Sequence, residues 1–174
     1  MNVLAFDPDS LTTGICFYSD GVYHVTASCP GETLFDQIEN IFSSVNEMVL
    51  LTEELIAFVE KPNIWIHGKS SHKDIINLAC QSGICAGISR EFALEVHFVS
   101  PTQWKGQRPK LIHQKFLCDQ LGWEYTERAG YVSIDEPHAK NLVVLDPPRG
   151  YSWWKHALDA VGIAHWAVVK METP

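Results

Sequence analysis

The first 60 residues of this 174-residue chain contain no lysine and no arginine, although they contain ten aspartates and glutamates. All 13 lysines and arginines lie in residues 61–174. The acidic part of the chain therefore needs an outside partner, or else its carboxylates simply face water. The formal net charge of −8 argues mildly against a general nucleic-acid binder, because phosphate contacts normally leave a basic surface.

The chain also lacks the marks of membrane, secreted and disulfide-rich proteins. No apolar run approaches the roughly 20 residues that cross a bilayer. No basic segment precedes an apolar stretch at the N-terminus, so we expect no signal peptide and a cytoplasmic protein. The five cysteines show no framework spacing and are expected to be reduced thiols. With 46% hydrophobic residues, the chain is expected to form one domain, 1–174.

Apolar periodicity predicts an α/β domain that opens with three strands, with Asp20 and Gly21 in a tight hairpin turn. Predicted strands lie at residues 2–6, 14–18, 21–26, 55–59 and 96–99, and predicted helices at 33–49, 73–94, 110–121 and about 152–171. Ser152 is expected to cap the last helix. Residues 123–151 are interpreted as a surface insertion that includes a short strand at 142–145. This order predicts a mixed five-stranded sheet flanked by helices rather than a doubly wound parallel sheet.

Three carboxylates occupy related places in this predicted topology. Asp7 follows the first strand, Glu60 follows the fourth, and Asp159 lies early in the last helix. His156 precedes Asp159 by three residues and shares its helix face. Clustered carboxylates repel each other unless cations bind between them, and hard oxygen ligands select Mg²⁺ or Mn²⁺. Two such ions about 4 Å apart can activate a water and stabilise the leaving oxygen in phosphodiester cleavage.

A locally basic segment follows the fifth predicted strand. Residues 96–118 contain no acidic residue but include Lys105, Arg108, Lys110 and Lys115. This asymmetry fits a protein that holds metal ions in one place and a polyanion beside it, although ordinary solvated faces remain an alternative.

Two other ligand sites are disfavoured by the sequence. The Gly-Lys-Ser at 68–70 resembles the end of a phosphate-binding loop, but Asn63 stands where the first glycine is required. A zinc site would need Cys80 and Cys85 together with two histidines. Because these cysteines are five residues apart in a predicted helix, they point to different faces.

Five short motifs resemble, in order, those of the RuvC-type Holliday junction resolvases. They are FDPDSLTTG, AFVEKP, QSGICAGI, VSPTQWKGQRPK and KHALDAVGIAHWAV. The resemblance covers residues 1–118 and 152–170 and implies a ribonuclease H-like fold. It also implies a metal-dependent endonuclease that nicks four-way DNA junctions as a homodimer, since symmetric resolution needs two cuts related by a two-fold axis.

Carried over by position, the resemblance implies that Asp7, Glu60, His156 and Asp159 are catalytic and bind metal, with Mg²⁺ as cofactor and Mn²⁺ as its substitute. His156 would either ligate metal or take a proton from the attacking water. Trp65 would either wedge against a splayed base or pack inward. The expected DNA contacts are Trp65, Lys69, Lys73, Lys105, Arg108, Lys110 and Lys115.

Two departures from the family pattern leave alternatives open. Asp9 stands where the family usually has glycine, and it is either a harmless turn former or an outer-shell carboxylate. The segment 123–151 is longer than expected. The same chemistry on other branched DNA or RNA–DNA hybrids remains a second function, and a catalytically silent junction-binding module a third. An actin-like ATPase would need a second domain, and the divergent motifs leave a viral or organellar source open.

Overall fold

The structure is a computed structural model that describes residues 1–9, 12–28, 33–49, 54–62, 71–128, 130–145 and 152–173. At its centre is a mixed sheet of six strands in the order β5-β4-β1-β2-β3-β8. The strands are β1 (Asn2–Asp7), β2 (Thr13–Ser19), β3 (Val22–Ser28), β4 (Leu55–Glu60), β5 (Glu95–Val99) and β8 (Leu142–Val144). The predicted mixed α/β sheet is confirmed. It has six strands rather than five because β8 adds a parallel edge strand beside β3.

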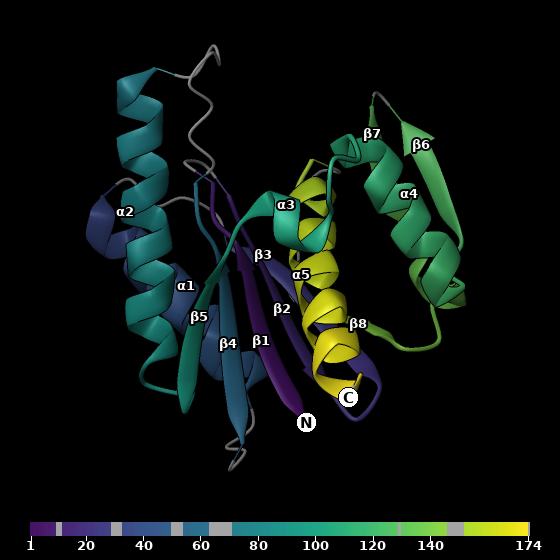
Figure 1. Ribbon diagram of the computed structural model, residues 1–174, viewed down its shortest axis with the longest axis horizontal. Coiled ribbons are helices and arrows are strands. Elements are labelled where there is room, and N and C mark those ends of the chain that lie inside the picture. The colour runs from purple at the N-terminus through teal and green to yellow at the C-terminus, as the bar shows by residue number, and fades with distance from the viewer. Residues whose placement is uncertain are drawn as a thin grey trace.

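Helices cover both faces of the sheet (Figure 1). On one face lie α1 (Leu34–Met48) and α2 (His72–Ser89), and on the other lies α5 (Trp154–Glu172). After β5, the chain forms α3 (Pro101–Trp104), α4 (Lys110–Leu121), the hairpin of β6 (Tyr125–Arg128) and β7 (Tyr131–Ile134), and the single turn η1 (Glu136–His138). Within the described ranges, no helix has both the length and the apolar character needed to cross a membrane.

Turn chemistry explains one predicted boundary and corrects another. The hairpin at Asp20 and Gly21 is confirmed, with φ angles of 50° and 84° that match the positive φ such turns require. The helix predicted to reach residue 94 ends at Ser89 instead. The chain then turns toward β5, and the backbone N–H of Leu94 donates to the carbonyl oxygen of Leu55 at 2.9 Å. A sheet-edge hydrogen bond therefore replaces the last predicted helical turn.

The start of α5 also differs from the prediction. The helix begins at Trp154 with Trp153 as its N-cap, and no side chain caps it, so Ser152 does not have the predicted role. Both tryptophans are buried, and their rings stack with centroids 4.2 Å apart. Packing of these two large aromatic rings, rather than a hydroxyl cap, fixes this end of the helix.

Strand alternation decides which layer each β1 side chain joins. Leu4 and Phe6 pack in the cluster that includes α1 and α2, whereas Val3 and Ala5 pack in the cluster that includes α5. Because successive side chains of a strand point to opposite faces, Asp7 is turned toward α5. A charged residue at the end of a buried strand thus lies on the face that the last helix covers.

The same alternation applies to β4. Phe58 packs with the α5 cluster, so Glu60, two residues later, points to the same face. The two strands are parallel, and their last recorded pair is Phe6 with Val59. Asp7 and Glu60 each follow directly on this pair. Two carboxylates from distant parts of the chain therefore lie at the C-terminal ends of neighbouring strands and on the same face of the sheet.

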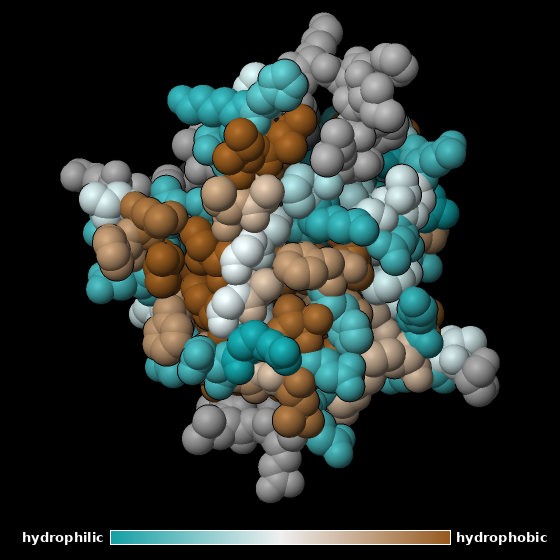
Figure 2. Space-filling model, turned by 60° about the vertical axis from the view of Figure 1, so that its left-hand side comes forward, coloured by the Kyte–Doolittle hydropathy of each residue, from teal (hydrophilic) through white to brown (hydrophobic). Residues whose placement is uncertain are grey.

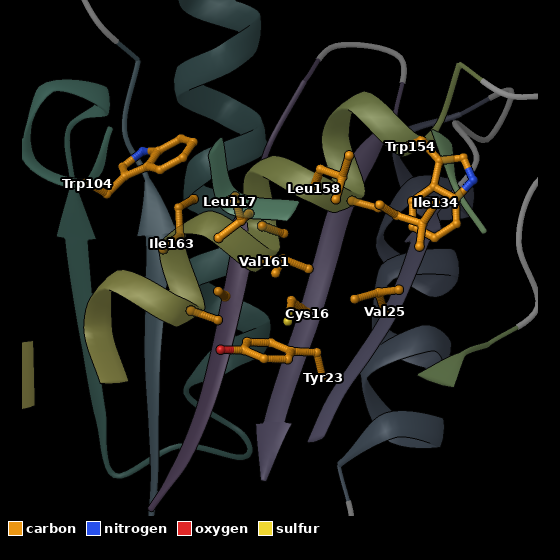
Figure 3. Packing of buried hydrophobic residues seen from close by; sticks show 14 of the residues in the cluster. Cys16, Tyr23, Val25, Trp104, Leu117, Ile134, Trp154, Leu158, Val161 and Ile163 are labelled. Carbon is orange, nitrogen blue, oxygen red and sulfur yellow. The ribbon is translucent and has the colours of Figure 1, made fainter. Parts of the chain in front are cut away.

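The segment interpreted as a surface insertion supplies core residues as well as β8. Trp123, Val132 and Ile134 are buried in the α5 cluster. The indole of Trp123 donates to the Asn141 side-chain oxygen at 2.6 Å. Figure 3 shows Ile134 with Trp154 toward one end of this cluster and Trp104 toward the other.

Candidate active site

A glycine sets the distance between α5 and the first hairpin. Gly14 is paired with Asp7 across the ladder between β1 and β2. A Cβ built on Gly14 would lie 2.0 Å from the backbone oxygen of His156, so only glycine permits this approach. The first turns of α5 consequently lie over the end of β1. His156 and Asp159 share one helix face there, because they are three residues apart.

We expect Gly14→Ala to destabilise the protein by about 1–3 kcal/mol, because the new methyl group would collide with backbone rather than with a flexible side chain. Urea denaturation would measure the loss. Gly83→Ala in α2 is the matched control, since nothing lies within 4 Å of the Cβ that it would add. Alanine favours helix there by up to about 1 kcal/mol. Equal stability of Gly14→Ala and the unmodified protein would contradict the close approach.

The predicted catalytic side chains from β1 and α5 form one buried cluster. Asp7 and His156 are each 5% exposed and Asp159 is 1% exposed. Asp7 Oδ2 lies 2.8 Å from His156 Nδ1. Lys110 Nζ, from the first residue of α4, lies 2.6 Å from Asp159 Oδ2 and 3.7 Å from Asp7 Oδ2. The N-terminal 60 residues contain no lysine or arginine, and Lys110 of the basic segment provides the positive charge between Asp7 and Asp159.

Two neutral donors that were not predicted each hold one further carboxylate oxygen of the cluster. Trp104, at the end of α3, donates its indole N–H to Glu60 Oε2 at 2.6 Å. Gln114 donates to Asp159 Oδ1 at 2.7 Å and to the backbone oxygen of Lys155 at 2.8 Å. Trp104 lies inside the motif VSPTQWKGQRPK, but that pattern signals only charge. Nothing local in the sequence marks either side chain as a donor to a carboxylate.

Burial and mutual charge separate the pKa values of the cluster. Burial, followed by the charge of Asp7, raises the pKa of Glu60 to about 8. Burial likewise raises the pKa of Asp159, although Lys110 works against it. At Asp7 the effect of burial is outweighed by Lys110 and His156, and its pKa lies below the ordinary value. Burial would lower the pKa of Lys110, but the two aspartates outweigh it and keep the ammonium charged.

Asp9 lies beside His156. Its Oδ2 lies 3.3 Å from His156 Nε2, so the imidazole stands between Asp7 and Asp9. This contact favours the outer-shell interpretation of Asp9 over the interpretation as a turn former alone.

The donor set fits a hard divalent cation. Asp7, Glu60 and Asp159 offer carboxylate oxygens, and the position of Lys110 between the two aspartates indicates that the cluster attracts positive charge. The ligand atoms of the three carboxylates do not all lie within 4.8 Å of one another. In the part of the chain that the structure describes, one group of acidic and histidine side chains has ligand atoms all within 4.8 Å of one another, and it is the exposed trio Glu124, Asp135 and His138.

The basic residues predicted to contact DNA differ in their surroundings. Lys105 Nζ lies 4.9 Å from the centroid of the Trp104 ring, close to the cluster. The Arg108 guanidinium lies over the ring of Phe116, at 4.2 Å. Lys115 forms an ion pair with Glu127 of β6. Lysines 105 and 110 are therefore the two basic side chains of this segment that border the carboxylates.

The remaining predicted contacts are less constrained by the structure. Lys73 is exposed in the first turn of α2. Trp65 and Lys69 lie outside the described residues. All seven DNA contacts stay predictions.

Solved structures match the fold of this chain, whereas comparisons of its sequence find no match. No protein-family model matches the chain, and no curated protein matches its sequence. The RuvC of T. thermophilus in complex with Holliday junction substrate aligns with a TM-score of 0.64 and 16% identity, covering 99% of this chain and 97% of that one. A second Thermus thermophilus RuvC structure aligns with a TM-score of 0.58 and 17% identity, covering 99% and 98%. The chain therefore has the ribonuclease H-like fold of the RuvC Holliday junction resolvases, as the resemblance of its motifs predicted.

Proposed function

We propose that the protein is a metal-dependent endonuclease that nicks four-way DNA junctions. The observation that carries the proposal is the convergence of Asp7, Glu60 and Asp159, from three separate elements, on one edge of a RuvC-like sheet. Burying three carboxylates together is costly for a fold. A catalytically silent junction-binding module would have no reason to keep this arrangement, so the cluster favours an enzyme.

The proposed metal ligands are these three carboxylates, with Mg²⁺ as cofactor and Mn²⁺ as its substitute. When bound, the metal would acidify a water and stabilise negative charge on phosphodiester oxygens. The hydrogen bond between Asp7 and His156 Nδ1 supports the role of His156 as a general base. With Nδ1 donating to Asp7, Nε2 carries the lone pair that takes a proton. Asp9, near Nε2, would stabilise the imidazolium that results.

Lys105 and Lys110 are the proposed phosphate contacts nearest the reacting bond. Lys110 already borders both aspartates, so a scissile phosphate held beside them would lie within reach of its ammonium. The positive charge of a lysine attracts phosphate as a point charge. Acidic and basic groups thus take different tasks in one site, the first holding metal and the second holding DNA.

Symmetric resolution further requires two copies of the chain, and we propose a homodimer. Exposed apolar side chains on α1, α2 and β5 include Phe35, Ile76 and Phe98. The side of the molecule that carries these elements shows apolar patches among polar side chains (Figure 2). Such patches are typical of interaction surfaces.

The test is a cleavage assay on an immobile four-way junction and a matched linear duplex, each with Mg²⁺, Mn²⁺ or EDTA. We expect paired, symmetric nicks on the junction alone and none with EDTA. Tight junction binding without cleavage in either metal would favour the silent module. Cleavage of flaps or RNA–DNA hybrids in place of junctions would favour the same chemistry on another substrate.

A further inference from the structure

We propose that Trp104 is a positioning residue for Glu60: its indole N–H holds one carboxylate oxygen and leaves the other for a divalent ion. The inference rests on the proposed nuclease function, because it assigns Glu60 to the metal. It concerns a side chain that the charge pattern of the basic segment does not single out.

The hydrogen bond that carries the inference is short and shielded. Trp104 Nε1 lies 2.6 Å from Glu60 Oε2, and the tryptophan is 5% exposed. An indole has one polar atom and only donates. A buried indole that uses this donor on a carboxylate is therefore committed to a single partner, and the partner is the one predicted ligand that strand β4 supplies.

Neighbouring elements fix the ring in the orientation that this bond needs. The ring of His113, from α4, packs edge-on against Trp104 with centroids 4.9 Å apart. A Cβ built on Gly162 of α5 would lie 2.6 Å from the indole carbon Cζ3 and 3.2 Å from His113 Nε2. Gly162 therefore provides the space that the ring occupies. Figure 3 shows Trp104 at the end of the apolar cluster, where it meets α5.

A neutral donor suits a metal ligand better than a cation does. Lys110 also holds carboxylate oxygens, but its charge opposes the approach of a divalent ion to Asp7 and Asp159. The indole N–H orients Glu60 without that repulsion. Partners of this kind, which orient a ligand without touching the metal, typically change metal affinity by about 10- to 100-fold when they are removed.

The first experiment measures Mn²⁺ binding by the DNA-free full chain, from the electron paramagnetic resonance of the free ion. Trp104→Phe keeps an aromatic ring against His113 and removes the N–H. We expect its Mn²⁺ affinity to fall about 10- to 100-fold while the circular dichroism spectrum is retained. Gly162→Ala should weaken binding similarly, because its Cβ would lie 2.6 Å from the indole ring and displace the ring from its position beside Glu60.

Trp166→Phe is the matched control, since Trp166 belongs to the same apolar cluster but packs edge-on against Phe58. Its affinity for Mn²⁺ should be unchanged. Unchanged affinity in Trp104→Phe would overturn the inference and leave the nuclease function standing, whereas a wild-type chain without divalent binding would overturn both. Equal weakening in both tryptophan variants would indicate a loosened core and would also overturn it.

A second measurement does not depend on the folding of the Trp104 variant. In ¹H–¹⁵N spectra of the unmodified chain and of Glu60→Ala, the indole N–H resonance of Trp104 should lie at different positions, because alanine offers no oxygen to accept the hydrogen bond. The indole resonance of Trp166 should stay in place. A Trp104 resonance that ignores the Glu60 substitution would contradict the hydrogen bond on which the inference depends.

Discussion

Asp7→Asn should lower the rate of metal-dependent junction nicking by roughly 10³-fold or more, the equivalent of about 4 kcal/mol of transition-state stabilisation. Asparagine keeps the shape of the side chain, and its oxygen can still accept the hydrogen bond that His156 Nδ1 donates across 2.8 Å. Lys110 also keeps its contact with Asp159. The substitution therefore removes one negative charge from the proposed metal site while the packing around it stays the same.

Single-turnover nicking of a labelled four-way junction would measure this loss. Junction binding in EDTA, followed by mobility shift, should be retained because the proposed phosphate contacts are untouched. Asp20→Asn is the matched control, since it makes the same change in an exposed hairpin turn where asparagine also accepts a positive φ. Asp7→Asn with activity within about tenfold of the unmodified protein would exclude Asp7 as an essential ligand.

The parts of the site that could be predicted from sequence are those that depend on the side-chain periodicity of a single strand or helix. Strand alternation directs Asp7 and Glu60 to one face, and helical spacing places His156 and Asp159 together. The parallel pairing of β1 and β4 then brings the C-terminal ends of the two strands to the same end of the sheet. These rules act over a few residues, so they can be applied without knowing how distant elements dock.

The parts that could not be predicted depend on docking between elements. Trp104 and Gln114 become carboxylate donors only because α3 and α4 pack against β4 and α5. The resemblance of its motif implied that Lys110 contacts DNA, but neither a motif nor a pattern of charges can show that its ammonium reaches two buried aspartates.

The segment after α4 was underestimated for a related reason. Its strands are only three or four residues long, too short for alternation to indicate burial. Trp123 and Ile134 are buried because α5 covers them, and α5 is contributed by the far end of the chain. Short strands that rely on a distant helix carry little signal of their own.

The affinity for Mg²⁺ should rise about tenfold per pH unit up to about pH 8 and level off above it, because a carboxylate must lose its proton to bind a cation. The relevant group is Glu60, whose pKa is raised from 4.5 to about 8 by burial and then by Asp7. Between these two values the folded chain keeps a proton on Glu60 that the unfolded chain has released. The metal-free protein is therefore expected to lose stability as the pH rises through this window.

Calorimetric titration of Mg²⁺ at pH 6, 7, 8 and 9, in buffers of different ionisation enthalpy, would give both the affinity and the number of protons released. Glu60→Gln should bind weakly at every pH and release fewer protons, since its amide cannot ionise. Glu47→Gln, on the exposed face of α1, should follow the unmodified protein. An affinity that is flat between pH 6 and 8 would mean that Glu60 is already ionised in the folded chain. In that case the repulsion from Asp7 would have to be compensated by cations beside the cluster, such as Lys105.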